Sequence, residues 1–315
     1  MAGVRNIMSS RAAKLRAAVA EAEHAGKLEH SLVQYAKSQE GFFPVGKTSQ
    51  ALRPDVYSLK YDQSASRFVF APHYLVTDKL MRLSDSKSEE VINEIEHFWT
   101  LREVFKAYGY VHKRGFLLHG PPGSGKTSTI AIVAEEMVKR GGIVILADNP
   151  SLVSDMLRNM REVEPVRPVV VILEDIDSII ENHGDEDTLS LLDGENSIDS
   201  VVYLATTNYP ENLEDRIINR PSRFDRVVKI GTPSAEARRQ YLQSKLDLPK
   251  KELAKWVTAS KGLSIAHLKE MIVSVCCFGM TLDEVSKRVK KMAIKPTSKS
   301  EDDSDGTPTL AQSDR

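Results

Sequence analysis

Apolar positions between residues 115 and 230 follow two alternating patterns, and this alternation sets the expected fold. Short apolar runs of strand length occur at 115–119, 142–147, 169–174, 201–206 and 227–230. The segments between them repeat apolar residues every three to four positions, as on one face of a helix. Strands that alternate with helices in this way predict an α/β fold, a parallel sheet with crossover helices.

The flanking segments follow other patterns. Residues 56–72 alternate apolar and polar side chains around a polar turn, which predicts a β-hairpin. Residues 88–108 show helical periodicity, and so does the Ala-rich stretch 1–40. The expected division is a helical segment at 1–40, a linker with a small β-hairpin region at 41–90, an α/β domain at 91–232, a helical lid at 233–295 and a tail at 296–315, disordered by composition. The lid helices are expected at 234–246, 250–259, 264–278 and 281–292.

Composition narrows the classes of partner. A net charge of −1 over 315 residues favours neither nucleic acid nor an anionic membrane surface. No apolar run approaches the length of a transmembrane helix, so we expect a cytoplasmic protein without a membrane anchor. The basic first twenty residues also fit an organelle transit peptide, although Glu21 and Glu23 continue the same helical pattern. The adjacent Cys276 and Cys277 suit no metal site, and we expect buried thiols in a reducing compartment.

The stretch 115-GFLLHGPPGSGKTSTI-130 contains the pattern G-x-x-x-x-G-K-[ST] of a phosphate-binding loop. Glycines let backbone N–H groups point at phosphate oxygens, and the N-terminus of the following helix favours anions. We expect Lys126 to reach the β- and γ-phosphates and Thr127 to bind Mg²⁺, so the predicted cofactors are ATP and Mg²⁺. The expected nucleotide-binding residues are Gly120, Pro121, Pro122, Gly123, Ser124, Gly125, Lys126, Thr127 and Ser128.

An acidic cluster follows the strand-like run at 169–173. Glu174, Asp175 and Asp177 repel one another unless a cation lies close to them. Beside a phosphate-binding loop, carboxylates at a strand end supply a second holder of Mg²⁺ and a residue that orients the attacking water. We therefore expect Thr127, Glu174 and Asp175 to hold the magnesium ion. An exposed acidic turn is the simpler alternative.

Further motifs follow in order along the chain. They are LLDG at 191–194, TTN at 206–208, RPSRFDR at 220–226 and GLSIAHL at 262–268. Together with the phosphate-binding loop, they resemble the AAA ATPase family over roughly half of the chain. The resemblance implies an AAA domain of the P-loop NTPase fold with a small helical lid, preceded by a small α+β region. Within the family, the chain is similar to the group that includes the mitochondrial translocase of the Rieske protein. We expect a bacterial or phage relative rather than that translocase.

The resemblance also implies roles for individual residues. Glu174 stands where the family has its magnesium-associated acid, and Asp175 where it has the glutamate that activates water. Asn208 matches the sensor of the γ-phosphate. Arg220 and Arg223 match paired arginine fingers that reach into a neighbouring subunit, which implies a homo-oligomeric ring, usually a hexamer. The simpler alternatives are a turn residue for Asn208 and a solvated basic loop for the two arginines.

The acid order departs from the family pattern, because most members read Asp-Glu where this chain reads Glu-Asp. An aspartate base is one methylene shorter, so it requires a closer backbone or a shifted water. Whether Glu174, Asp175 or Asp177 is the base stays open at this point.

The segments that match the family's two pore loops also carry unusual residues. Residues 149–159 match the first loop, but Met156, Leu157 and Arg158 replace the usual aromatic, aliphatic and glycine residues. Ordinary helix packing explains these residues equally well, which leaves the threading of a polypeptide open. Residues 181–194 match the second loop and carry three successive acids, Asp185, Glu186 and Asp187. We expect them to line a channel, with a solvated turn as the alternative.

The predicted function is a ring-forming ATPase, an enzyme that remodels an unidentified protein partner. One alternative is a nucleotide-gated scaffold that hardly hydrolyses ATP. A second is a nucleic-acid motor or loader, which no basic groove interleaved with aromatic residues supports. A small-molecule kinase shares the phosphate-binding loop but leaves the RPSRFDR motif unexplained.

Overall fold

The structure is a computed structural model that describes residues 34–37, 42–46, 48–63, 67–74, 80–83, 86–193, 198–213 and 223–293. The chain divides into two compact units, Met1–Arg53 and Pro54–Arg315. In the first unit, β1 (Gln34–Lys37) pairs antiparallel with β2 (Phe42–Val45). The predicted helix over 1–40 is therefore wrong at Gln34–Lys37, and residues 1–33 lie outside the described residues. Backbone pairing with β2 overrides the helical pattern here, since strand preference depends strongly on context.

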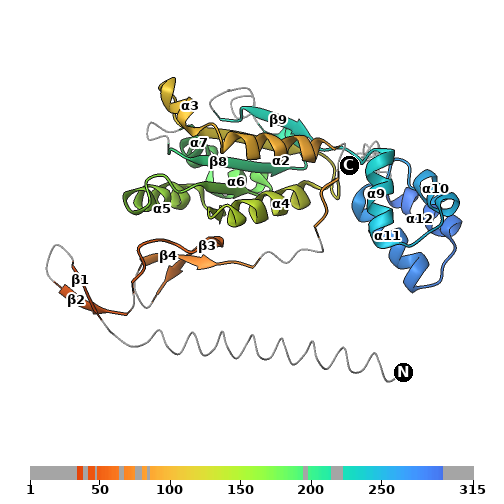
Figure 1. Ribbon diagram of the computed structural model, residues 1–315, viewed down its shortest axis with the longest axis horizontal. Helices are drawn as coiled ribbons and strands as arrows, with labels where there is room; N and C mark the ends of the chain where they lie inside the picture. Colours follow the sequence, from red (N-terminus) through yellow and green to blue (C-terminus); the bar gives the residue numbers. More distant parts are fainter. Residues whose placement is uncertain are drawn as a thin grey trace, which may run out of the picture. The chain divides into compact units, whose positions relative to one another are not determined.

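The second unit is built on a seven-stranded sheet in the order β4-β3-β6-β7-β8-β5-β9 (Figure 1). The strands β5, β6, β7, β8 and β9 run parallel, as the alternation of strands and helices predicted. Their bounds are Lys113–His119, Ile143–Leu146, Val169–Leu173, Val201–Thr207 and Arg226–Lys229. Every residue of β7 and β8 is buried, as expected for strands covered on both faces.

Two helices cover one face of this sheet. They are α2 (Lys87–Phe98) and α4 (Lys126–Lys139), which share a core with alternate residues of the strands, among them Phe116, Ile172 and Leu204. Three further helices contact one another, and α6 also contacts β8. They are α5 (Pro150–Val163), α6 (Ile176–His183) and α7 (Asp185–Asp193). The short 3-10 helix η1 (Pro210–Asn212) follows β8.

The predicted hairpin is present, but it is part of the main sheet. Strand β3 (Val56–Asp62) pairs antiparallel with β4 (Arg67–Pro72) and parallel with β6, where Val56 lies opposite Val144. The sequence predicts this hairpin in a region of its own at 41–90, whereas β3 pairs with β6 and thereby covers the backbone edge of that strand.

Helix α2 ends at Phe98, and α3 (Arg102–Ala107) begins after a break. The sequence predicted one helix over 88–108 with Val104 on its apolar face, but Val104 is exposed. Phe98 and Phe105 contact each other edge to face across the break, and the ring of His112 stacks on Phe98. These contacts favour a bent path over a straight helix.

The residues after Pro233 form a separate helical lid with its own apolar core. Its helices are α9 (Ala235–Lys245), α10 (Lys250–Ala259), α11 (Ile265–Ile272), the π-helix η2 (Val273–Cys277) and α12 (Leu282–Ala293). The expected helix 264–278 thus changes to π geometry, with Phe278 N–H bonded to the Val273 carbonyl. Cys276 and Cys277 lie within this π-helix and are exposed, so the prediction of buried thiols is wrong.

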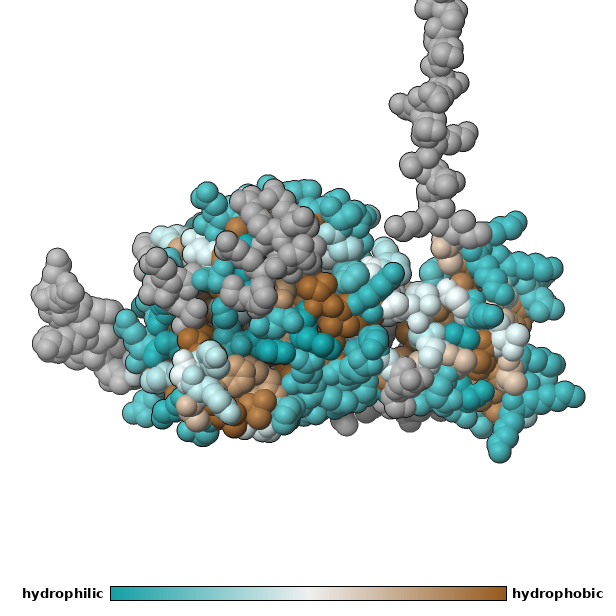
Figure 2. Space-filling model, turned by 90° about the horizontal axis from the view of Figure 1, so that it is seen from above, coloured by the Kyte–Doolittle hydropathy of each residue, from teal (hydrophilic) through white to brown (hydrophobic). Residues whose placement is uncertain are grey.

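The helices and the surface of the molecule can be compared with the expectation that the chain has no transmembrane helix. Among the helices of the described residues, none combines the length and apolar content needed to cross a membrane. Figure 2 shows one face of the molecule, on which hydrophilic residues cover most of the surface and hydrophobic residues form small separate patches.

Candidate nucleotide-binding site

The phosphate-binding loop lies between the end of β5 and the start of α4. Gly120, Gly123 and Gly125 all have positive φ angles, a conformation that side chains with a Cβ rarely adopt. A Cβ at Gly120 would also lie 2.1 Å from the carbonyl oxygen of Ile230. Helix α4 begins without a side-chain cap, so its first N–H groups are available to a phosphate.

Lys126 links three of the predicted site residues. Its Nζ donates to the carbonyl oxygen of Gly120 and to Oδ1 of Asn208, each at 2.7 Å. The Nδ2 of Asn208 donates in turn to Oδ1 of Asp175 at 3.3 Å. Burial lowers the pKa of Lys126, and the nearby charges of Asp175 and Asp177 oppose that shift. The strands β7, β8 and β5 are neighbours, so their carboxyl ends bring these side chains together.

Thr127 and Glu174 form a second contact in the same site. The Oγ1 of Thr127 donates to Oε1 of Glu174 at 2.9 Å. A hydroxyl and a carboxylate are hard oxygen ligands, and Mg²⁺ typically takes one or two carboxylates together with phosphate oxygens. Within the part of the chain that the structure describes, no three His, Cys, Asp or Glu residues cluster as a metal site. The hydroxyl of Thr127 and the carboxylate of Glu174 suit a magnesium ion held jointly with a nucleotide, since both are hard oxygen ligands.

Asp175 has a left-handed backbone conformation, with φ 49° and ψ 59°. Its N–H donates to Oγ1 of Thr206 at 3.1 Å, and Thr206 is buried in β8. Aspartate tolerates this conformation better than most residues because its short polar side chain can bond locally. The turned backbone directs the Asp175 carboxylate to Asn208. Asp177 lies in the first turn of α6, and its Oδ1 is buried without a hydrogen-bond partner among the described residues.

A cavity of about 1100 Å³ opens from these residues. It has room for a nucleotide, since ligand pockets usually measure about 300–1,000 Å³. The phosphate-binding loop, both acids, Thr206 and Asn208 line one part of it. Two other parts of the lining were not predicted from the sequence: residues 80–83 and 86–89, and lid residues such as Ile265 and Ile272. The only local signal for the first was a short apolar segment, Leu80–Leu83, just before the helix cap Ser86.

Of the two expected arginine fingers, Arg220 lies outside the described residues. Arg223 is 7% exposed, and its Nε lies 3.2 Å from Oδ2 of Asp193 in α7. Gly115 permits this placement, because a Cβ there would lie 1.9 Å from the carbonyl oxygen of Arg223. Arg223 thus faces its own subunit in this structure.

The two segments matched to pore loops are helical. Met156, Leu157 and Arg158 lie in α5, where Leu157 is fully buried and Arg158 forms an ion pair with Asp155 at 2.7 Å. Asp185, Glu186 and Asp187 form the first turn of α7, where acids are favourable near the positive end of the helix dipole.

A parallel sheet, a phosphate-binding loop between β5 and α4, and acids at the neighbouring strand end define a P-loop NTPase. More specifically, residues 116–232 match the ATPase family associated with various cellular activities, AAA. This part of the chain is therefore similar to the AAA ATPase domain.

Two curated proteins illustrate the similarity. The chain is 32% identical over 173 residues to the ATPase family gene 2 protein of Saccharomyces cerevisiae, a match that covers 49% of this chain and 22% of that protein. It is 32% identical over 193 residues to the ATPase family gene 2 protein homolog A of Homo sapiens, covering 53% of this chain and 21% of that protein. The matched part of the chain thus spans about a fifth of these curated relatives.

Proposed function

We propose that this chain couples ATP hydrolysis at the described site to the remodelling of a protein partner, as one subunit of a homo-oligomeric ring. The observation that carries the hydrolytic part is the set of contacts Lys126–Asn208–Asp175 and Thr127–Glu174. They join a phosphate-binding cation, an amide, a carboxylate and two oxygen ligands for a metal at one edge of the sheet.

The contacts suggest how the residues work in turn. A γ-phosphate competes with Asn208 for the ammonium group of Lys126, because a charged acceptor bonds more strongly than a neutral amide oxygen. Asn208 is then free to orient a water molecule toward the phosphate. The carboxylate of Asp175, held beside Asn208, accepts the proton of that water. When bound with the nucleotide, Mg²⁺ neutralises charge that develops on the phosphate oxygens.

Ring formation rests on the RPSRFDR motif and the resemblance to AAA ATPases. An arginine supplied by a neighbour contributes about 10³–10⁵ in rate in related phosphoryl-transfer systems. For Arg223 to serve this purpose, a neighbouring subunit has to replace its contact with Asp193. The hexameric state, the likeness to the group of the Rieske-protein translocase, a bacterial or phage origin and a cytoplasmic location remain predictions.

A protein partner fits better than nucleic acid. The acids of the first turn of α7 repel phosphate backbones, and the net charge of −1 provides no compensating attraction. The scaffold alternative draws on the same acid pair, because an aspartate in place of glutamate can bind ATP–Mg²⁺ and still hydrolyse it slowly.

Steady-state phosphate release, measured over a range of protein concentrations with and without an unfolded protein substrate, tests the proposal. Hydrolysis that rises in specific activity with concentration and is stimulated by protein agrees with it. Tight ATP binding with negligible turnover at every concentration would instead establish the scaffold. Stimulation by DNA or RNA alone would establish the nucleic-acid motor.

A further inference from the structure

The nucleotide cavity has a wall that lies outside the region matched to the AAA family. The segment Leu80–Leu83, which we call the strap, lines the cavity together with the start of α2. The strap has neither helix nor strand geometry, and Leu80 packs against the core beneath α2 and α4. The phosphate-binding loop and the acids account for the polyphosphate end, so the apolar strap residues fit the base and ribose of a nucleotide.

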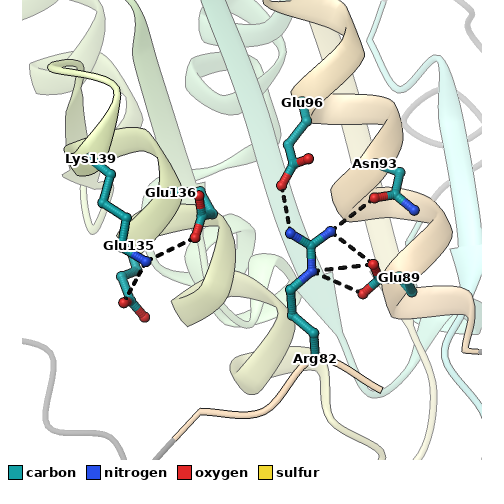
Figure 3. A network of polar contacts seen from close by, with 7 residues as sticks. All are labelled: Arg82, Glu89, Asn93, Glu96, Glu135, Glu136 and Lys139. Atoms are coloured by element: carbon teal, nitrogen blue, oxygen red, sulfur yellow. Dashed lines mark hydrogen bonds and ion pairs between the residues drawn. The ribbon is translucent and has the colours of Figure 1, made fainter. Parts of the chain in front are cut away.

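Arg82 attaches the strap to α2 (Figure 3). Its Nη2 donates to Oε1 of Glu89 at 2.8 Å and to Oδ1 of Asn93 at 2.9 Å, while Nη1 donates to Oε1 of Glu96 at 2.8 Å. The spacing of these three acceptors places them on one face of the helix. A planar guanidinium is suited to several simultaneous contacts of this kind.

Few other polar contacts hold the strap. Among the described residues, its remaining hydrogen bond to the domain is from Oγ of Ser86 to the carbonyl oxygen of Leu83. A segment without a backbone hydrogen-bond ladder depends on its side chains for a fixed position. The position of the strap therefore depends on the Arg82 contacts together with the packing of Leu80 against the core.

Helix α2 is in turn fixed to the phosphate-binding loop. The Oγ1 of Thr129, in the first turns of α4, donates to Oγ of Ser88 at 2.8 Å. Ile92 of α2 and Ile132 of α4 both line the cavity. Through α2, the Arg82 contacts set the distance between the strap and the residues that hold the phosphates.

Arg82 also neutralises charge beside the cavity. Glu89 lines the cavity itself, and Glu96 lies two turns further along α2. Without Arg82, the carboxylate of Glu89 would line the cavity without its paired cation. The guanidinium thus has a mechanical effect on the strap and an electrostatic effect on the ligand.

We propose that Arg82 is a positioning residue for the base end of the nucleotide, holding Leu80–Leu83 as the apolar wall against which the base and ribose pack. The inference rests on the proposed nucleotide-binding function. We expect Arg82 to affect binding of the base and not of the phosphates, because the phosphate-binding loop does not depend on the strap.

The test uses the full chain with two probes, Mg–ATP and Mg–tripolyphosphate, which shares the phosphates but lacks the base. Arg82→Gln should weaken ATP binding and raise KM for ATP about tenfold, the loss of roughly one charge-assisted contact network, with kcat largely kept. The double change Arg82→Gln, Glu89→Gln removes the unpaired carboxylate. Its affinity for tripolyphosphate should lie within about twofold of the wild type, while its binding of ATP stays weak.

Lys139→Gln is the matched control. Lys139 forms ion pairs with Glu135 and Glu136 at 2.8 and 3.0 Å on α4, away from the cavity lining (Figure 3). It should leave both affinities unchanged. Melting temperatures of all variants show whether the domain stays folded, as partly exposed ion pairs contribute little to stability.

Two results would overturn the inference alone: ATP affinity of Arg82→Gln equal to that of the wild type, or recovery of ATP affinity in the double variant. An equal loss of ATP and tripolyphosphate binding, in Arg82→Gln and in the double variant alike, would also contradict the inference. The effect would then not concern the base. A wild-type chain that binds neither probe would overturn the proposed function as well.

Discussion

Replacing Asp175 by asparagine tests the assignment of the catalytic base with little change of shape. Asparagine has the same size and also tolerates the left-handed backbone found at this position. Its side-chain oxygen can still accept from Nδ2 of Asn208. The basicity and the negative charge of the carboxylate are lost, and loss of a general base typically lowers the rate by about 10²–10⁴. We expect kcat to fall by that factor, with the affinity for Mg–ATP unchanged.

The backbone geometry gives a second variant for comparison. Alanine at position 175 also removes the base, but it lacks the local polar contacts that ease the left-handed conformation. A left-handed residue costs about 1–2 kcal/mol, much of which aspartate and asparagine offset. In a domain of this size each kcal/mol lowers Tm by roughly 2–4 °C. Asp175→Ala should therefore be slow and less stable, whereas Asp175→Asn should be slow and equally stable.

Three measurements separate the possible outcomes. They are steady-state phosphate release, calorimetric titration with Mg–ATP and thermal unfolding. An asparagine variant that keeps more than half of the wild-type rate would refute the assignment and direct attention to Glu174 or Asp177. A fall in ATP affinity equal to the fall in rate would instead mean that Asp175 holds the metal.

Other substitutions test the loop, the ring and the packing. Lys126→Ala should weaken ATP binding by about 10²-fold or more, as charged hydrogen bonds contribute ~1.5–3 kcal/mol each; unchanged affinity in a titration would contradict the loop assignment. Dilution should lower specific ATPase activity if Arg223 acts across subunits; a flat profile would refute that. Gly115→Ala should cost about 1–3 kcal/mol through overpacking against Arg223. Gly231→Ala, where a Cβ meets nothing within 4 Å, is the control in denaturant unfolding.

The site was predictable where chemistry depends on neighbours in sequence. The loop from Gly120 to Thr127 and the acids after β7 each form one short segment whose residue types are set by phosphate and metal. The sequence indicated Asn208 only through the resemblance to AAA ATPases, and the fold brings it to Lys126 and Asp175 because parallel strands end at one edge of the sheet.

The parts that escaped prediction depend on contacts between distant segments. The alternation in residues 56–72 predicted a hairpin but not its pairing with β6. Alternation indicates which face of a strand is buried, and it does not identify the strand that lies beside it. Arg82 reads in sequence as an ordinary exposed charge, and only the fold places Glu89, Asn93 and Glu96 around it. Cys276 is exposed within a π-helical turn that helical periodicity does not reveal.

The pairing of β3 with β6 has a consequence for how the chain is made. Val56 lies opposite Val144, so the hairpin leaves the ribosome well before its partner strand exists. At ~5–20 residues per second, the delay is roughly 4–18 s. During that interval Val56 and Tyr57, both buried in the finished sheet, lack β6 as a neighbour, although Tyr57 already lies opposite Pro72 of β4. The speed of translation between residues 60 and 140 therefore sets how long the hairpin exposes apolar side chains before β6 is made. Slow codons in this stretch would favour aggregation of the nascent chain.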